Sequence, residues 1–214
     1  MRILVLGAGA REHALAWRLA RDEGGHELRI APGNGGTDAV AERVVDLDPL
    51  DPVAVARHAG RERYDLVVIG PEAPLAAGVA DALAQAGLPA FGPSRAAARL
   101  ESSKAFAKEQ LARAGVPTAA SRTFRDAEAA QAWIGTQEAP PVVKADWLAA
   151  GKGVVVPETP DEAADAVRAL LAGAEPGASL VLEERLVGRE VSAFAFVSGE
   201  AVIPLGAARD YKRL

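Results

Sequence analysis

The stretch Pro141-Val-Val-Lys144-Ala-Asp-Trp-Leu-Ala-Ala-Gly151-Lys152-Gly153-Val-Val-Val156 decides the fold of the second half of this chain. Its two apolar, β-branched runs, at 142–143 and 154–156, predict short strands that pair with each other. Between them, Lys152 stands between two glycines, which lack a Cβ atom. Glycine lets the backbone approach an anion closely, so this connection favours a mobile cation over a phosphate group.

Lys144 adds a second cation where the first of these strands ends. One fixed and one mobile ammonium group around a glycine hinge suit a triphosphate. The alternative is a surface hairpin with solvated lysines. The loop is not a P-loop of the G-x-x-x-x-G-K-[ST] type, because Gly153 stands where that motif requires Ser or Thr.

Composition limits the classes of protein and of site. With 214 residues, half of them apolar, the chain can form one large or two small domains. The net charge of −5, without a block of like charges, argues against nucleic-acid and membrane partners. The absence of cysteine excludes disulfides and thiolate catalysis. With no signal peptide and no apolar run of membrane length, we expect a cytoplasmic protein. We also expect it to be a monomer.

The chain opens with an apolar strand, Arg2-Ile-Leu-Val-Leu, followed by Gly7-Ala-Gly9 and a helix with Leu15 and Leu19 on one face. A strand, a glycine turn and a helix N-terminus form an anion site from backbone N–H groups. The turn resembles the dinucleotide motif G-x-G-x-x-G, but Glu12 occupies the third glycine position. No clear acidic ribose ligand follows the next strand, so NAD binding is disfavoured.

Strands and helices continue to alternate, which predicts a doubly wound parallel sheet. One buried strand runs into Gly70-Pro71-Glu72. Ligands of such sheets gather at the carboxyl ends of the strands, so Glu72 is a site candidate beside Gly7 and Gly9; the alternative is a rigid turn with an exposed acid. We expect further strands at 28–31, 44–47, 65–70 and 89–92, with helices at 52–59 and 76–86.

Two alanine-rich helices are predicted next, at 94–100 with Ser94 as N-cap and at 102–114 with Lys104 in the first turn. A cation there opposes the helix dipole, a cost that a bound anion would remove. Gly115-Val-Pro-Thr118 then breaks the pattern and marks a domain boundary after residue 117. Beyond it we expect strands at 121–124 and 179–184, helices at 126–134 and 159–173, and a hairpin of 190–197 with 201–205.

Lys104, Lys144, the Gly151–Gly153 loop, the strand ending in Glu183-Glu184, and Glu190 together resemble the nucleotide half of an ATP-grasp ligase. Further motifs make the chain similar, over essentially its whole length, to the phosphoribosylamine–glycine ligase (glycinamide ribonucleotide synthetase) family of purine biosynthesis. These motifs are Gly7-Ala-Gly-Ala-Arg-Glu-His-Ala14, Ala31-Pro-Gly-Asn34, Gly70-Pro-Glu-Ala-Pro-Leu75, Phe91-Gly-Pro-Ser94, Leu100-Glu-Ser-Ser-Lys-Ala-Phe106 and Asp210-Tyr-Lys-Arg213.

The resemblance implies an α/β fold: a doubly wound substrate-side domain at 1–117, an α+β ATP-grasp small lobe at 118–190, and the start of the large lobe at 191–214. It implies that ATP phosphorylates the carboxylate of glycine and that the amine of 5-phosphoribosylamine attacks the acyl phosphate. The family also uses Mg²⁺ or Mn²⁺. Its metal ligands are expected beyond Leu214, so we expect none within this chain and no turnover by these residues alone.

The resemblance also implies individual roles. Lys144 and Lys152 are expected to be catalytic, because they neutralise charge on the transferring phosphoryl group. The implied ATP-binding residues are Lys104, Lys144, Gly151, Lys152, Gly153, Glu183, Glu184, Leu186 and Glu190. The residues implied near glycine and 5-phosphoribosylamine are Gly7, Gly9, Arg11, Glu12, Gly33, Asn34, Gly70, Pro71, Glu72, Asp210 and Lys212.

One residue departs from the family pattern. Trp147 stands where the family usually has glycine, which adds a large ring and removes backbone freedom in the lid. Two alternatives stay open: another ATP-grasp enzyme, acting on a purine intermediate or as a biotin-type carboxylase, and a non-catalytic nucleotide-binding module. The motifs at 31–34 and 70–75 weigh against the first.

Overall fold

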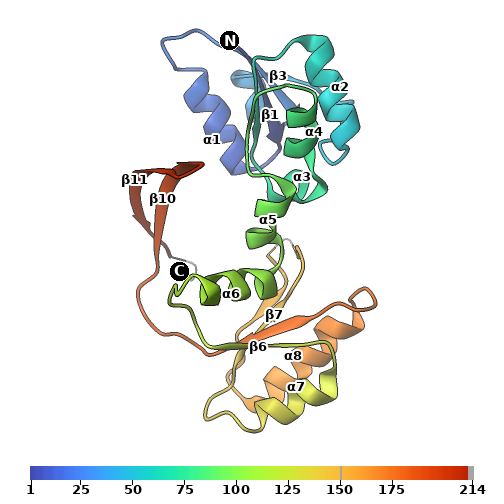
Figure 1. The fold of residues 1–214 in the computed structure, drawn as a ribbon, viewed down its shortest axis with the longest axis vertical. Coiled ribbons are helices and arrows are strands. Elements are labelled where there is room, and N and C mark those ends of the chain that lie inside the picture. Colours follow the sequence, from blue (N-terminus) through green and yellow to red (C-terminus); the bar gives the residue numbers. More distant parts are fainter. Residues whose placement is uncertain (150, 212–214) are drawn as a thin grey trace.

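The first sheet consists of five parallel strands in a computed structural model that describes residues 1–149 and 151–211 (Figure 1). Their order reverses between β1 and β4, so those two strand ends form the crevice at which α/β sheets bind ligands. The strands run, from edge to edge, β3 (Glu42–Arg43), β2 (Glu27–Pro32), β1 (Arg2–Gly7), β4 (Leu66–Ile69) and β5 (Ala90–Phe91).

Helices cover both faces of this sheet, as the sequence predicts. Helix α1 (Ala10–Leu19) packs on one face, where Ala16 joins a core with Ile3, Val5 and Ile30. On the other face, α2 (Pro52–Glu62), α3 (Glu72–Ala77) and α4 (Val79–Gln85) pack against the alternate strand residues. A short 3₁₀ turn, η1 (Thr37–Ala39), follows β2. The doubly wound prediction is confirmed.

Three local predictions differ from the structure. The helix predicted at 76–86 is divided at Gly78, whose φ of +98° ends α3 before α4 begins. The strand predicted at 44–47 lies at 42–43 instead, where only two residues pair with β2. Leu15 is exposed, because Glu12 and Ala16 are the residues of α1 that face the sheet. Hydrophobic patterning does not identify an acidic residue such as Glu12 as part of a core.

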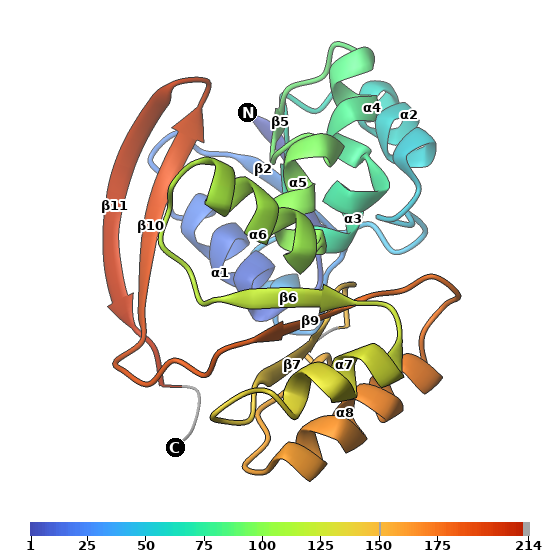
Figure 2. The same ribbon diagram turned by 60° about the horizontal axis from the view of Figure 1, so that its bottom comes forward.

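The second sheet is antiparallel and has the order β6-β9-β7-β8. The predicted pairing around the glycine-lysine stretch is confirmed, with Val143 opposite Val155. Helices α7 (Ala127–Ile134) and α8 (Pro160–Ala172) lie together against one face (Figure 2). The four strands are β6 (Ser121–Phe124), β7 (Val142–Ala145), β8 (Val154–Val155) and β9 (Leu180–Glu183).

Helices α5 (Arg95–Ser102) and α6 (Lys104–Arg113) connect the two sheets. Ser94 caps α5 as predicted, by accepting a hydrogen bond from the N–H of Ala97. Figure 1 shows α6 on the opposite side of the second sheet from α7 and α8. Since alternate strand residues point to opposite faces, Val143 and Leu182 enter the core with those helices, whereas Lys144 and Glu183 point the other way.

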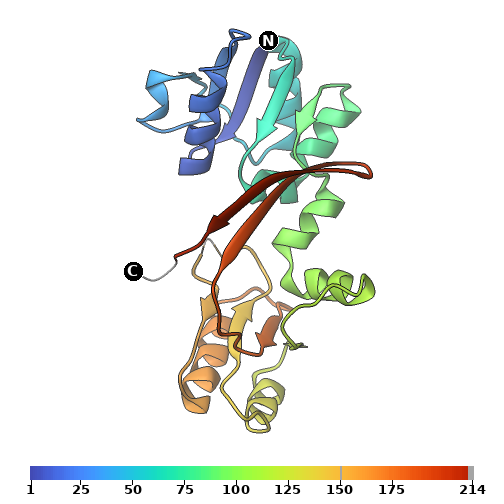
Figure 3. The same ribbon diagram turned by 90° about the vertical axis from the view of Figure 1, so that its left-hand side faces the viewer.

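Strands β10 (Val191–Ser198) and β11 (Ala201–Arg209) form the predicted hairpin, a sheet of its own (Figure 3). The hairpin reaches back to the first sheet, where Phe196 meets Phe91 edge to face with ring centroids 5.7 Å apart. Among the described residues, no helix combines the length and the apolar character needed to cross a bilayer.

Candidate functional site

A first group of predicted site residues gathers at the carboxyl edge of the parallel sheet, and we call it the strand-end cluster. Gly7 ends β1, and Gly70 directly follows β4, so both lie at the crevice where the strand order reverses. The members of the cluster are Gly7, Gly9, Arg11, Glu12, Gly33, Asn34, Gly70, Pro71 and Glu72.

The side chain of Glu12 fills this crevice. It is 3% exposed, and its Oε2 accepts a hydrogen bond of 2.7 Å from the N–H of Gly9. A Cβ atom at Gly70 would lie 2.3 Å from Glu12 Oε1, and one at Gly7 would lie 2.4 Å from Glu12 Cγ. Gly7 and Gly70 therefore leave the space that the buried Glu12 side chain occupies. The Glu12 carboxyl group occupies the space at this helix N-terminus, so the turn does not leave room there for the phosphates of a dinucleotide.

The loop after β2 is tied to the same turn. Asn34 Nδ2 donates a hydrogen bond of 2.8 Å to the carbonyl oxygen of Ala8. The N–H of Gly33 donates one of 3.1 Å to the carbonyl oxygen of Gly7. Asn34 Oδ1 accepts from the N–H groups of Gly36 and Thr37 at 2.8 and 3.2 Å. The glycine turn after β1 and the loop after β2 therefore form one surface.

Arg11 and Glu72 form an ion pair across this surface, with Arg11 Nη2 and Glu72 Oε2 3.1 Å apart. Glu72 is the first residue of α3, and the pKa of its carboxyl is lowered, first by its own backbone N–H and then by Arg11. The strand-end cluster thus combines an ionised acid with an exposed guanidinium, a pair suited to hydroxyl and phosphate groups.

A second group lies between α6 and the second sheet, and we call Lys104, Lys108, Lys144 and Glu183 the lysine cluster. Lys144 Nζ donates a hydrogen bond of 2.8 Å to Glu183 Oε2. The two side chains are diagonal neighbours on one face, because Lys144 pairs in register with Val181 and Glu183 with Val142. The side chain of Glu183 is 8% exposed, so its carboxylate needs a cation beside it.

Lys108 was missed by the sequence reasoning. Its Nζ lies 3.3 Å from the same Glu183 oxygen and donates to Thr118 Oγ1 and to the carbonyl oxygen of Ala119, both at 2.8 Å. The available signal was its spacing of four from Lys104, which puts both on one face of a helix. A cavity of about 260 Å³ is lined by Leu100, Glu101, Lys104, Ala107, Lys108, Leu111, Lys144 and Glu183.

The glycine-lysine loop closes tightly at its base. The N–H of Ala145 donates a hydrogen bond of 2.7 Å to the carbonyl oxygen of Gly153, and a Cβ at Gly153 would lie 2.6 Å from that of Ala149. Gly151 has a φ of +82°, a conformation that favours glycine. Lys152, in contrast, is exposed, so its ammonium group is accessible to a ligand.

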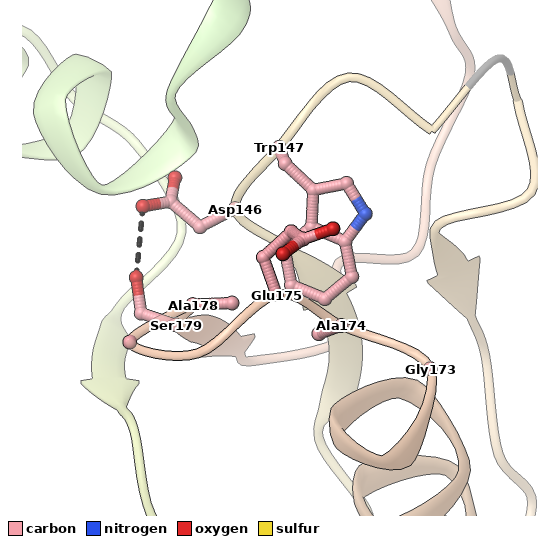
Figure 4. Close-up of a pocket in the computed structure, with 8 residues that line it drawn as sticks. Asp146, Trp147, Gly173, Ala174, Glu175, Ala178 and Ser179 are labelled. Atoms are coloured by element: carbon pink, nitrogen blue, oxygen red, sulfur yellow. Dashed lines mark hydrogen bonds between the residues drawn. The ribbon is translucent and has the colours of Figure 1, made fainter.

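Asp146 was also not assigned a role by the sequence. Its carboxylate accepts hydrogen bonds from the N–H of Ala105 at 2.8 Å and from Ser103 Oγ at 3.1 Å. It also accepts one of 3.0 Å from Ser179 Oγ (Figure 4). Asp146 therefore joins the end of β7 to the first turn of α6. Beside it, Trp147 packs against the core of the second sheet and lines a pocket at the end of α8, so the departure from glycine fills space next to that helix.

The remaining predicted residues lie outside both clusters. Glu184 Oε1 accepts a hydrogen bond of 2.9 Å from the N–H of Ala120, and Leu186 is 70% exposed. At the open end of the hairpin, the N–H of Asp210 donates a hydrogen bond of 3.1 Å to the carbonyl oxygen of Glu190. Lys212 lies outside the described residues. Within residues 1–149 and 151–211, no three His, Asp or Glu side chains are grouped as metal ligands.

Comparison with known proteins matches residues 1–101 to the family model "Phosphoribosylglycinamide synthetase, N domain" and residues 102–214 to "Phosphoribosylglycinamide synthetase, ATP-grasp (A) domain". The chain is 47% identical over 219 residues to phosphoribosylamine–glycine ligase of Vibrio parahaemolyticus, covering 100% of this chain and 51% of the relative. It is 50% identical over 216 residues to the Brucella melitensis ligase, covering 100% and 50%.

A solved structure gives the same result at the level of the fold. The crystal structure of phosphoribosylamine–glycine ligase from Thermotoga maritima superposes with a TM-score of 0.80 at 30% identity, over 100% of this chain and 51% of that one. The chain therefore spans about half the length of the curated relatives that it matches. The fold expected from the sequence is confirmed.

Proposed function

The chain belongs to the phosphoribosylglycinamide synthetase family, and from this premise we propose that its residues serve an ATP-dependent carbon–nitrogen ligase. The reaction joins glycine to 5-phosphoribosylamine. ATP phosphorylates the glycine carboxylate, and the amine then displaces phosphate from the acyl phosphate to give glycinamide ribonucleotide. The products are this amide, ADP and phosphate.

The observation that carries the proposal is the lysine cluster. Three ammonium groups and one buried carboxylate meet where α6 faces the second sheet, beside a cavity. Partly desolvated cations stabilise an anion more strongly than solvated ones do, so this arrangement suits the phosphates of ATP. Lys104 and Lys144 are the cations proposed to bind them, with exposed Lys152 able to approach from the loop.

The strand-end cluster is proposed to hold 5-phosphoribosylamine. Glu72 is ionised and accepts hydrogen bonds, so it can bind sugar hydroxyls, and Arg11 offers a cation for a phosphate. Proposed roles also extend to backbone groups near Glu184 to Leu186 for the adenine, Glu190 for the ribose, and Asp210 and Lys212 for the substrates. Together the two clusters would bring the acyl phosphate and the attacking amine to the space between the sheets.

The family implies a divalent metal ion, which would neutralise phosphate charge when bound. The described residues offer no grouped set of ligands for it, so we assign none of them to the metal. The identity of the ion, Mg²⁺ or Mn²⁺, stays a prediction, as do the cytoplasmic location and the monomeric state.

Calorimetry with ATP tests the nucleotide site directly. Lys144→Ala should weaken binding by about 1.5–3 kcal/mol, the contribution of a typical hydrogen bond to a charged group. Arg122→Ala, which removes an exposed cation from β6, should leave the affinity unchanged. Phosphate release with glycine and 5-phosphoribosylamine, measured on the protein of the complete reading frame, tests the reaction. Release with other carboxylate–amine pairs but not with this one would contradict the proposal.

A further inference from the structure

We propose that Lys108 is a positioning residue of the nucleotide site, which keeps Glu183 charge-compensated when Lys144 turns toward a bound phosphate. This inference rests on the proposed function, because it takes Lys144 to be a ligand of ATP. It assigns Lys108 a role without direct contact to the nucleotide.

The ammonium group of Lys108 is fully used within the protein. It has three N–H donors, and three acceptors surround it: Thr118 Oγ1 and the carbonyl oxygen of Ala119, both at 2.8 Å, and Glu183 Oε2 at 3.3 Å. With 17% of its side chain exposed, Lys108 is fixed between α6, the segment before β6, and β9. It is therefore placed to hold its neighbours rather than a ligand.

Glu183 needs such a neighbour, because its other cation has to move. Lys144 Nζ lies 2.8 Å from Glu183 Oε2, the same oxygen that Lys108 approaches. A buried carboxylate that loses its counter-charge is strongly destabilised. If Lys144 alone compensated Glu183, each phosphate that bound Lys144 would leave the acid uncompensated. Lys108 removes this conflict, because it remains at Glu183 throughout.

The charges that line the cavity support the same role. Lys104, Lys108 and Lys144 face Glu101 and Glu183, so three cations meet two carboxylates and leave a surplus of one positive charge. Without Lys108 the balance would be two against two. Lys108 therefore offsets Glu183: with both of these charges absent, Lys104 and Lys144 against Glu101 would again leave one positive charge for a phosphate.

Calorimetry of ATP binding to the full chain tests the proposal. Lys108→Met should lower the affinity about tenfold, and Lys108→Arg, which retains the charge, should recover most of it. Thr118→Val removes one hydrogen bond of Lys108 but leaves its cation beside Glu183, so it should bind ATP as the parent does. A loss in Thr118→Val as large as that in Lys108→Met would assign the effect to the connection before β6 and overturn the inference.

The Glu183→Gln background gives the decisive comparison. Without the carboxylate there is no buried anion to compensate, so adding Lys108→Met should then change ATP affinity by less than about twofold. A tenfold loss in both backgrounds would show that Lys108 acts independently of Glu183, and the proposal would be wrong.

A second readout needs no nucleotide. Amine acylation followed by peptide mass spectrometry reports how often Lys144 is released from Glu183. In Lys108→Met, Lys144 is the cation left on that oxygen, so its acylation should slow relative to the parent. Arg113→Met, at the exposed far end of α6, is the matched control and should change nothing. An unchanged Lys144 rate in Lys108→Met overturns the inference. If the slowing appears but the parent binds no ATP, the proposed function is wrong, whereas the compensation of Glu183 by both Lys108 and Lys144 is supported.

Discussion

The carboxylate of Asp146 accepts a hydrogen bond of 2.8 Å from the backbone N–H of Ala105, the second residue of α6. Asp146 follows β7, the strand of Lys144, and Ala105 follows Lys104. One side chain therefore fixes the relative position of two cations that come from different parts of the fold. It also puts a negative charge at the N-terminus of α6, where it stabilises the helix dipole.

Asp146→Ala should destabilise the protein by about 1–3 kcal/mol, because it leaves the N–H of Ala105 and the hydroxyls of Ser103 and Ser179 without their acceptor. Urea denaturation measures this loss. Asp126→Ala removes the N-cap of α7, which does not join two parts of the fold, and should cost only about 1 kcal/mol. Equal losses in the two variants would contradict the joining role of Asp146.

Trp147→Gly should loosen the glycine-lysine loop. The indole ring packs against the core of the second sheet, and glycine would both lose this contact and gain backbone freedom. Limited trypsin digestion should then cleave faster after Lys152. The neighbouring Leu148, which is 38% exposed, provides the control: Leu148→Gly should accelerate cleavage much less. Equal cleavage of parent and Trp147→Gly would refute this role.

Arg11→Ala should raise the pKa of Glu72 only part of the way to its ordinary value of 4.5, because the backbone N–H of Glu72 remains as the larger cause of the shift. A carboxyl whose pKa is lowered in the folded chain favours folding above its ordinary pKa, and this contribution disappears as pH falls through the folded pKa. NMR titration of the Glu72 carboxyl measures the shift. Full return to 4.5 would mean that Arg11 alone causes it.

Gly70→Ala should destabilise the first domain by about 1–3 kcal/mol, since the new methyl group would overlap the buried side chain of Glu12. Thermal unfolding followed by circular dichroism checks this. Gly35→Ala is the matched control, because a Cβ there meets nothing within 4 Å. The double variant Glu12→Ala with Gly70→Ala should lack the overlap, and if it gains nothing over the sum of the single variants, Glu12 is not the cause.

Hydrophobic patterning was sufficient to predict most of the architecture. The strand at the start of the chain, the pairing of Val143 with Val155, and the Ser94 cap follow from local rules, and the structure has all three. Hydrophobic patterning failed where the decisive contact joined residues that are distant in sequence. The buried face of α1 depends on Glu12 entering the crevice beside Gly70, a relationship across 58 positions that no periodicity reveals.

The candidate site shows the same limit. Lys104, Lys144 and Glu183 are recognisable from a family pattern, and the fold brings them to one cavity. Lys108 carries one weak local signal, its spacing of four from Lys104, and Asp146 carries none, because each acts through a hydrogen bond to a segment that lies beside it only after folding.

The diagonal position of Lys144 and Glu183 makes strand register a condition for the lysine cluster as well as for stability. Successive residues of β7 point to opposite faces, so an insertion at the start of β7 that shifted the strand by one residue along β9 would turn Lys144 toward the apolar helices α7 and α8 and Val143 toward the lysine cluster. Length changes in descendants of this gene should therefore accumulate in the turns, such as that before Pro141, and spare the strand itself.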